Sequence, residues 1–246
     1  MKQLIVNADD FGFSRDVNEG ITHAQRNGIL TATTLMATGP AFEHAVALAR
    51  ECPELDVGVH LVLVGAEGYP ATPARLAAAI ALGRVPIYDR LARQVETILK
   101  AGIQPTHLDT HKHTHILPPV LDAVTRIAQE FHIPWVRRPI AASLPVIGSL
   151  LQNRLVRSGC RTTDHFAGFD MTGRYDTSGL VAMIRKLPDG VTEFMCHPGF
   201  CGEELRAAAT RLKDSRRIEL DALTSDDARQ ALSESAVTLI RYRDLV

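Results

Sequence analysis

The segment LIVNADDFG, residues 4–12, sets the first strand of the fold and ends it in two adjacent carboxylates. Leu4–Ala8 forms a largely apolar run of strand length, and Asp9, Asp10 and Gly12 follow it. Adjacent carboxylates repel each other and are costly to desolvate, so a nearby cation would remove a large penalty. The alternative is a helix N-cap followed by a turn, with Gly12 permitting the bend. The segment alone leaves both interpretations open.

Strand-like runs recur along the chain and alternate with helical stretches. The expected strands are Leu4–Ala8, Thr33–Ala37, Val57–Leu63, His107–His111, Trp135–Arg137, His165–Phe169, Thr192–Cys196 and Thr238–Tyr242. The expected helices are Val17–Asn27, Ala41–Arg50, Leu91–Lys100, Val120–Glu130, Ser178–Lys186 and Asp226–Ser233. This alternation favours a parallel sheet covered by helices. Seven or eight such units predict an α/β, barrel-like (β/α) fold with seven or eight mostly parallel strands, and an open doubly wound sheet is the alternative.

The chain is expected to form a single domain over residues 1–246, because its length suits one barrel-type unit and no linker interrupts it. Two helix starts are readable. Pro118-Pro119 suits a first helical turn, and Ser225 suits an N-cap. The polar, charged segment Glu203–Asp221 is expected to be a helical excursion at the surface.

Composition argues against several classes of function. The 27 Lys and Arg residues nearly balance the 28 Asp and Glu residues, without a basic block, so no nucleic-acid partner is expected. The four cysteines contain no CxxC pair, which is typical of a reducing compartment. The first residues lack the apolar region of a signal peptide, and the weakly polar residues 139–151 are too few to span a bilayer. We therefore expect a soluble, cytoplasmic protein with no transmembrane segment.

Histidines lie in or at the ends of three further expected strands, and sites of parallel α/β folds gather at the carboxyl ends of strands. His60 lies in an apolar run, where a hydrogen-bonded core histidine is the alternative to a ligand. His197 ends another strand, and Pro198 and Gly199 after it would expose its ring at the same edge.

The block THLDTHKHTH, residues 106–115, is the densest group of candidate ligands. A strand there would place His107, Asp109 and His111 on one face, because side chains alternate with period two. Imidazoles that bind metal ions usually have a carboxylate behind them, a role that Asp109 could fill. A histidine-rich surface loop is the alternative. With an Asp and two His as ligands, a spare carboxylate and a spare histidine could act as general base and general acid.

These segments resemble the YdjC-like carbohydrate deacetylases, a family that includes chitooligosaccharide deacetylases and hopanoid-associated HpnK proteins. The resemblance covers nearly the whole chain. It rests on four segments in order: IVNADDFG at residues 5–12, GVH at 58–60, the block at 106–115 and MCHP at 195–198.

The resemblance implies a role for each matching residue. The metal ligands of the family fall on Asp10, His60 and His111. Asp9 matches the carboxylate that acts as general base, and His197 matches the histidine that protonates the leaving amine.

A site arginine of the family falls near Arg137, with Arg138 as the alternative. Arg137 and Asp109 are therefore expected to bind substrate or to support a ligand. Whether His113 and His115 contribute is left open.

The implied activity is hydrolysis of the acetamide of an N-acetylated sugar, in an N-acetylglucosamine-containing oligosaccharide or a glycolipid, with release of acetate. One divalent ion is implied, magnesium or zinc, and two imidazole ligands favour zinc or another transition metal. The alternatives are a metal-dependent hydrolase of another amide or ester on the same fold, and a non-catalytic sugar-binding homologue. A homodimer is left open.

Overall fold

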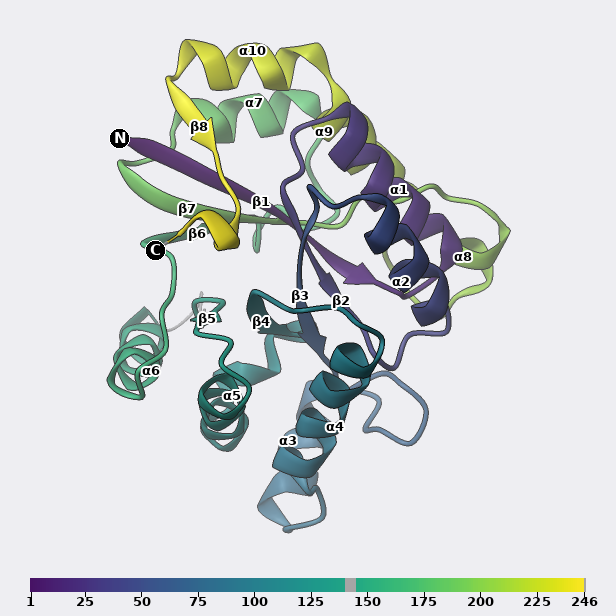
Figure 1. The fold of residues 1–246 in the computed structure, drawn as a ribbon, viewed down its shortest axis with the longest axis vertical. Helices are drawn as coiled ribbons and strands as arrows, with labels where there is room; N and C mark the ends of the chain where they lie inside the picture. Colours follow the sequence, from purple (N-terminus) through teal and green to yellow (C-terminus); the bar gives the residue numbers. More distant parts are fainter. Residues whose placement is uncertain (140–144, 246) are drawn as a thin grey trace. The chain divides into compact units, whose positions relative to one another are not determined.

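The computed structural model describes residues 1–139 and 145–245, which fall into two compact units. The first unit comprises Met1–Leu35, Gly39–Asp56 and Thr163–Val246, and the second comprises Met36–Thr38 and Val57–Thr162. Each unit combines strands and helices (Figure 1).

All eight expected strands are present in the described residues, with ends that differ by a few residues from those predicted. They are β1 (Lys2–Phe11), β2 (Ala32–Leu35), β3 (Asp56–Leu61), β4 (His107–Thr110), β5 (Trp135–Val136), β6 (His165–Ala167), β7 (Gly190–Cys196) and β8 (Val237–Leu239).

The helices include the six that were expected. They are α1 (Arg15–Asn27), α2 (Phe42–Glu51), α3 (Pro73–Ala81), α4 (Ile87–Lys100), α5 (Pro118–Glu130), α6 (Pro145–Arg157), α7 (Thr177–Arg185), α8 (Glu203–Ala207), α9 (Asp214–Thr224) and α10 (Asp226–Glu234), with 3₁₀ helices η1 (His111–Ile116) and η2 (Tyr242–Asp244). Both readable helix starts are confirmed. α5 opens with Pro118-Pro119, and the Ser225 hydroxyl accepts a hydrogen bond from the Ala228 amide at 3.2 Å.

The first unit is built around β1, which has parallel partners on both sides. On one side Lys2–Ala8 pair with Gly190–Cys196 of β7, and β7 pairs in turn with β6. On the other side Lys2–Leu4 pair with β8, and the later residues of β1 pair with β2. The apolar residues of β1 are fully buried, as expected for a parallel strand covered on both faces. Around this sheet α1 packs against α2 and α9, and α7 packs against α9 and α10 (Figure 1).

The second unit contains β3, β4 and β5 as parallel neighbours, with α4 packed against α5. Val59 pairs with Leu108, and Leu108 pairs with Val136. Where β3 ends, the Gln94 side chain bonds both the amide and the carbonyl of Val62 at 2.8 Å. A side-chain amide thus takes the place of a strand partner for this buried backbone.

The prediction that Glu203–Asp221 is a surface excursion is wrong for α9. Arg216, Glu219 and Leu220 are each 1% exposed, because α9 packs against α1 and α7 in the first unit. The helices α3 and α6 were not among those expected from the sequence. Residues 140–144 of the weakly polar stretch lie outside the described residues.

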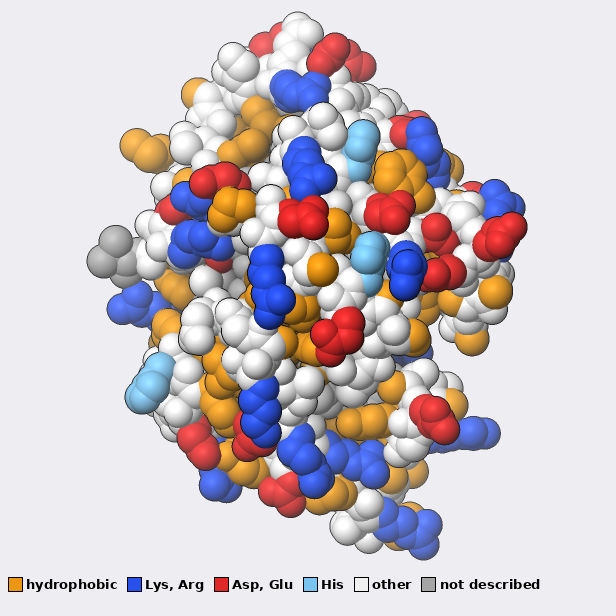
Figure 2. Space-filling model, turned by 45° about the vertical axis from the view of Figure 1, so that its right-hand side comes forward, with side chains coloured by type: hydrophobic (Ala, Val, Ile, Leu, Met, Phe, Trp, Pro, Cys, Tyr) orange, Lys and Arg blue, Asp and Glu red, His pale blue; other side chains and the backbone are white. Residues whose placement is uncertain are grey.

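None of the described helices is long and apolar enough to cross a membrane. On the face in Figure 2, acidic and basic side chains are interspersed, as the near balance of charges in the sequence suggests. Apolar side chains on α6 are nevertheless exposed, among them Val146, Ile147 and Leu150.

Gly20 in α1 lies against the backbone that follows β7, and we predict that Gly20→Ala destabilises the protein. A Cβ atom at this position would lie 2.4 Å from Gly199 Cα and 2.9 Å from the Phe200 amide nitrogen. We expect the free energy of unfolding to fall by about 1–3 kcal/mol, although alanine has the higher helix propensity.

Denaturant unfolding of Gly20→Ala and of Glu19→Ala, an exposed neighbour on the same helix, measures this effect. Glu19→Ala should stay within about 0.5 kcal/mol of wild type. A Gly20→Ala protein at least as stable as wild type would show that α1 can move away from this backbone.

Candidate active site

The two carboxylates that end β1 are directed to different partners by an irregular backbone. Ala8 pairs with Thr33 and Phe11 pairs with Leu35, so β1 has one extra residue between these pairs. Asp10 has a φ of 70°, in the left-handed region that aspartate tolerates better than most residues. A bulge of this kind re-aims side chains at the end of a strand. Asp9 and Asp10 are both buried there, at 3% and 4% exposure.

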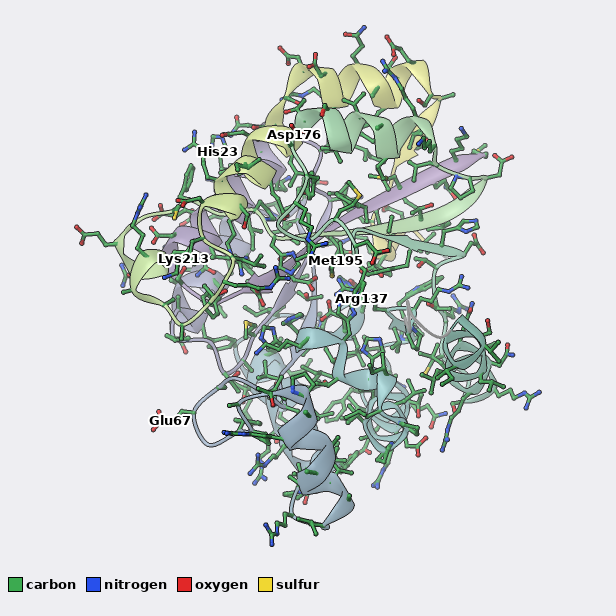
Figure 3. All side chains as sticks on the ribbon, turned by 180° about the vertical axis from the view of Figure 1, so that it is seen from behind. His23, Glu67, Arg137, Asp176, Met195 and Lys213 are labelled. Carbon is green, nitrogen blue, oxygen red and sulfur yellow. The ribbon has the colours of Figure 1, made fainter. Side chains whose placement is uncertain are left out.

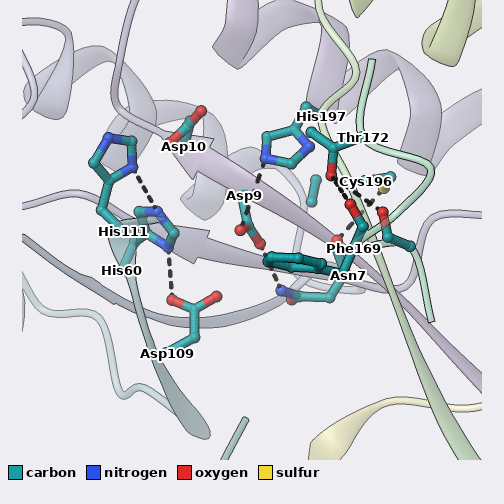
Figure 4. Close-up of polar contacts among 12 residues, drawn as sticks. Asn7, Asp9, Asp10, His60, Asp109, His111, Phe169, Thr172, Cys196 and His197 are labelled. Atoms are coloured by element: carbon teal, nitrogen blue, oxygen red, sulfur yellow. Dashed lines mark hydrogen bonds and ion pairs between the residues drawn. The ribbon is translucent and has the colours of Figure 1, made fainter. Parts of the chain in front are cut away.

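Asp9 lies beside His197 because β1 and β7 are paired in register. Ala8 pairs with Cys196, and the next residue of each strand is Asp9 or His197. One carboxylate oxygen of Asp9 lies 3.9 Å from His197 Nε2, and the other accepts a hydrogen bond from the Asn7 side chain at 3.4 Å (Figure 4). The structure therefore places the expected base and the expected acid next to each other.

The backbone of His197 is held by Glu219 of α9. One carboxylate oxygen of Glu219 accepts the His197 amide at 2.6 Å, and the other accepts the Gly173 amide at 2.8 Å. Because Glu219 is only 1% exposed, these bonds face little competition from water. Glu219 thereby ties the end of β7 to the loop that follows β6.

Asp10 pairs with Arg216, which is also on α9. Arg216 Nη2 donates to Asp10 Oδ2 at 2.5 Å, and the Arg216 side chain is 1% exposed. Neither Arg216 nor Glu219 was predicted from the sequence to belong to the site. A signal was present, because both residues lie on the helix face of Leu220 and Leu223, at spacings typical of an apolar stripe.

Burial lowers the pKa of His197 below its ordinary value. The charges of Asp9, Glu219 and Asp10 oppose this shift, and the charge of Arg216 adds to it. His197 is therefore a neutral imidazole at neutral pH in this environment.

The second unit contains a buried series of paired side chains on neighbouring strands. His60 Nδ1 lies 2.6 Å from one oxygen of Asp109, and Arg137 Nη1 lies 2.7 Å from the other. All three residues are 1% exposed. The register that pairs His60 with Asp109 produces the first contact. Of the two arginines that the sequence left as candidates, Arg137 pairs with Asp109. Figure 3 shows it in the interior, whereas Glu67 projects from the loop after β3.

His111 reaches His60 from a turn, so the prediction that β4 extends to His111 is wrong. The strand ends at Thr110, and Lys112 and His113 adopt left-handed φ values of 54° and 52°. This turn brings His111 Nδ1 to 3.2 Å from His60 Nε2 (Figure 4). Left-handed backbone in residues other than glycine is costly, and such strain is commonly found at functional sites.

The remaining histidines of the block have other surroundings. His107 lies deeper in the sheet against Gly58, where an added Cβ would lie 2.6 Å from the imidazole. His115 Nδ1 lies 2.6 Å from the Thr110 hydroxyl, which also accepts the His115 amide. His115 thus stabilises the turn that orients His111, and the His113 ring lies 6.0 Å from that of His115.

Each unit therefore presents a group of candidate residues, all of them buried except the partly exposed His111. Asp9, Asp10 and His197 lie together in the first unit, and His60, Asp109, His111 and Arg137 lie together in the second. Each unit has side chains of the kinds that bind metal ions: the carboxylates of Asp9 and Asp10 in the first, and His60, His111 and Asp109 in the second.

Comparison with known proteins gives full-length matches. A family model described as "YdjC-like protein" matches residues 3–234. The chain is 34% identical to a carbohydrate deacetylase from Geobacillus stearothermophilus, over 99% of this chain and 98% of that relative. It is 36% identical to a chitooligosaccharide deacetylase from Klebsiella pneumoniae (strain 342), over 98% of both chains.

Among solved structures, the chain is similar to an Enterococcus faecalis V583 protein described as a candidate for cellobiose-phosphate cleavage. The TM-score is 0.84 at 27% identity, over 100% of this chain and 99% of that chain. This similarity confirms the expected fold class, an α/β, barrel-like (β/α) fold, and the described strand pairs are parallel.

We predict that Asp109→Asn destabilises the protein strongly, because it removes the charge that pairs with Arg137 in the interior. Breaking a buried ion pair costs about 3–5 kcal/mol. Asp122→Asn is a matched control, since Asp122 lies 2.7 Å from Arg154 but both side chains are about half exposed. That control should cost at most about 1 kcal/mol. If denaturant unfolding showed the same loss of unfolding free energy for Asp109→Asn and Asp122→Asn, burial of the ion pair would not explain the effect.

The lowered pKa of His197 predicts a pH dependence of stability in the metal-free protein. In the unfolded chain His197 binds a proton at about pH 6.5, whereas in the folded protein it binds the proton only at lower pH. The free energy of unfolding should therefore fall as the pH decreases below about 6.5, and rise with pH above the folded pKa. His197→Gln should reduce this slope, as measured by urea unfolding at several pH values. Parallel slopes for the two proteins would argue against a neutral buried imidazole.

Proposed function

Since the chain belongs to the YdjC-like family, we propose that it uses a divalent metal ion to hydrolyse the acetamide of an N-acetylated sugar and release acetate. The geometry that supports this best is the buried His60–Asp109–Arg137 series. A carboxylate that binds one imidazole nitrogen orients the other nitrogen towards a metal ion. Two full-length relatives named as deacetylases of carbohydrates support the class of substrate.

The proposed metal ligands are Asp10, His60 and His111. His60 Nε2 and His111 Nδ1 face each other at 3.2 Å. Two nitrogen ligands at about 2.0–2.1 Å from a tetrahedral zinc ion would lie about 3.3 Å apart, so the imidazole pair fits such an ion. A carboxylate with two imidazoles also leaves a coordination position open for water or substrate. Zinc suits two imidazoles better than magnesium does, and both ions belong to the proposal.

When bound, the ion would polarise the acetamide carbonyl and lower the pKa of the attacking water. Asp9 would accept a proton from that water, since it is the carboxylate beside His197. His197 would deliver a proton to the departing sugar amine. Asp9 and His197 Nε2 are 3.9 Å apart, so a proton taken up by Asp9 would reach His197, and then the amine, through a bridging water or after the pair closes to hydrogen-bond distance.

The substrate would be an N-acetylglucosamine-containing oligosaccharide or a glycolipid. Hydrolysis of another amide or ester on the same fold is the second candidate, and a non-catalytic sugar-binding protein is the third. A pure binding protein has no need for a base and an acid held side by side, which favours the hydrolase. Action in the cytoplasm and assembly into a homodimer stay predictions from the sequence.

The test is acetate release from the zinc- or magnesium-loaded protein, with N-acetylglucosamine oligosaccharides, N-acetylated glycolipids and simple acetyl esters as separate substrates. We predict that Asp9→Asn abolishes turnover but keeps the metal, whereas Asp10→Asn lowers metal occupancy. His197→Ala should slow turnover by about 10²–10⁴-fold.

Metal content measured by atomic absorption separates these variants. Near-normal acetate release by Asp9→Asn would remove Asp9 as the base. Release from esters but not from N-acetyl sugars would favour the second candidate, and sugar binding without any release would favour the third.

A further inference from the structure

Arg216 is a buried cation whose side chain makes one hydrogen bond among the described residues, to a proposed metal ligand. Its Nη2 donates to Asp10 Oδ2 at 2.5 Å, and the side chain is 1% exposed. Its Nε and Nη1 atoms are buried and have no hydrogen-bond partner among the described residues. A guanidinium is always charged, so the group is a fixed positive charge with few polar contacts.

The position of Arg216 is set by the packing of α9. The Arg216 carbonyl accepts the Gly199 amide at 3.1 Å. A Cβ atom added to Gly199 would lie 3.3 Å from Arg216 Cδ, so the side chain passes closely over this backbone. The guanidinium also lies 5.8 Å from the centre of the Phe13 ring. These contacts fix the side chain on the Asp10 side, unlike a flexible surface arginine.

The positive charge of Arg216 balances negative charge on buried carboxyl groups nearby in the fold. Asp9, Asp10 and Glu219 are buried carboxyl groups in the same unit, at 3%, 4% and 1% exposure. Buried carboxylates need a counter-charge, and without one they protonate or destabilise the fold. A bound metal ion would supply that charge at Asp10, but the chain must also fold before the ion binds.

We propose that Arg216 is a positioning residue that acts as a resident counter-ion for Asp10. It holds the carboxylate oriented through Oδ2 while no divalent ion is bound. Because it is itself positive, it also weakens the affinity for a divalent ion. The inference rests on the proposed metal ligands and adds a residue that sets the affinity of that site.

The test compares Arg216→Met and Arg216→Gln with Arg217→Met, using zinc alone as the probe. Arg217 lies on the same helix, but it is exposed and pairs with Asp221 at 2.8 Å. Calorimetry gives the zinc affinity, and thermal unfolding with and without zinc gives the stability. Arg216→Met should have a lower midpoint than wild type without zinc, and zinc should raise its midpoint by more than it raises that of wild type.

We expect the zinc dissociation constant of both Arg216 variants to fall by about tenfold or more, and that of Arg217→Met to stay within about twofold. Arg216→Lys keeps the charge and should bind zinc as wild type does. In the Asp10→Asn background, Arg216→Met should raise the zinc affinity by less than it does in wild type, because no carboxylate is left for Arg216 and zinc to share. A purely structural role would instead lower stability equally with and without zinc.

Several results would overturn the inference. Zinc binding by wild type, with equal or weaker binding by Arg216→Gln, removes the counter-ion role but leaves the proposed metal site intact. If neither wild type nor either variant binds zinc, both the metal site and the inference fail. If Arg216→Met does not fold without zinc, it is refolded in the presence of zinc. The inference predicts that zinc restores folding, and a protein that stays unfolded with zinc overturns the inference.

Discussion

The parallel register of β1 with β7 is the constraint on which the chemistry of the first unit depends. Pairing of Ala8 with Cys196 makes Asp9 and His197 neighbours, although they are far apart in sequence. A slip of one residue would turn each side chain to the opposite face of the sheet. The apolar residues of β1 prevent this slip because they are buried on both faces. The extra residue between Ala8 and Phe11 then lets two adjacent carboxylates face different partners.

Both units stabilise a buried carboxylate with a buried arginine. Asp10 pairs with Arg216 in the first unit, and Asp109 pairs with Arg137 in the second. Such pairs contribute little to stability compared with apolar packing, because desolvation offsets the attraction. What they do provide is a fixed orientation. With one oxygen bound to arginine, the other oxygen of Asp109 is directed at His60 Nδ1.

The role of α9 shows how one helix can organise a site without contributing a recognised motif. Arg216 and Glu219 are three residues apart and so lie on the same face, and they contact Asp10 and the His197 amide. Their neighbours Arg217 and Asp221 pair with each other at the surface. Residue type does not distinguish the buried Arg216 and Glu219 from the exposed Arg217 and Asp221, since each set has one arginine and one acidic residue. The difference is that Leu220 and Leu223 continue the face on which Arg216 and Glu219 lie.

The sequence alone determined the strands, most helices, the family and the positions of the candidate residues, because periodicity and strand-end motifs are local properties of the chain. Asp9, Asp10 and His197 could be named from their place at strand ends, and His60 from an apolar strand run together with the family resemblance. Only the tertiary structure decided that His111 leaves the strand through a left-handed turn and that Arg137 pairs with Asp109. It also decided that Arg216 is buried against Asp10. These facts depend on which distant backbone packs against each residue, and charge pairing across long sequence separations leaves no local pattern to read.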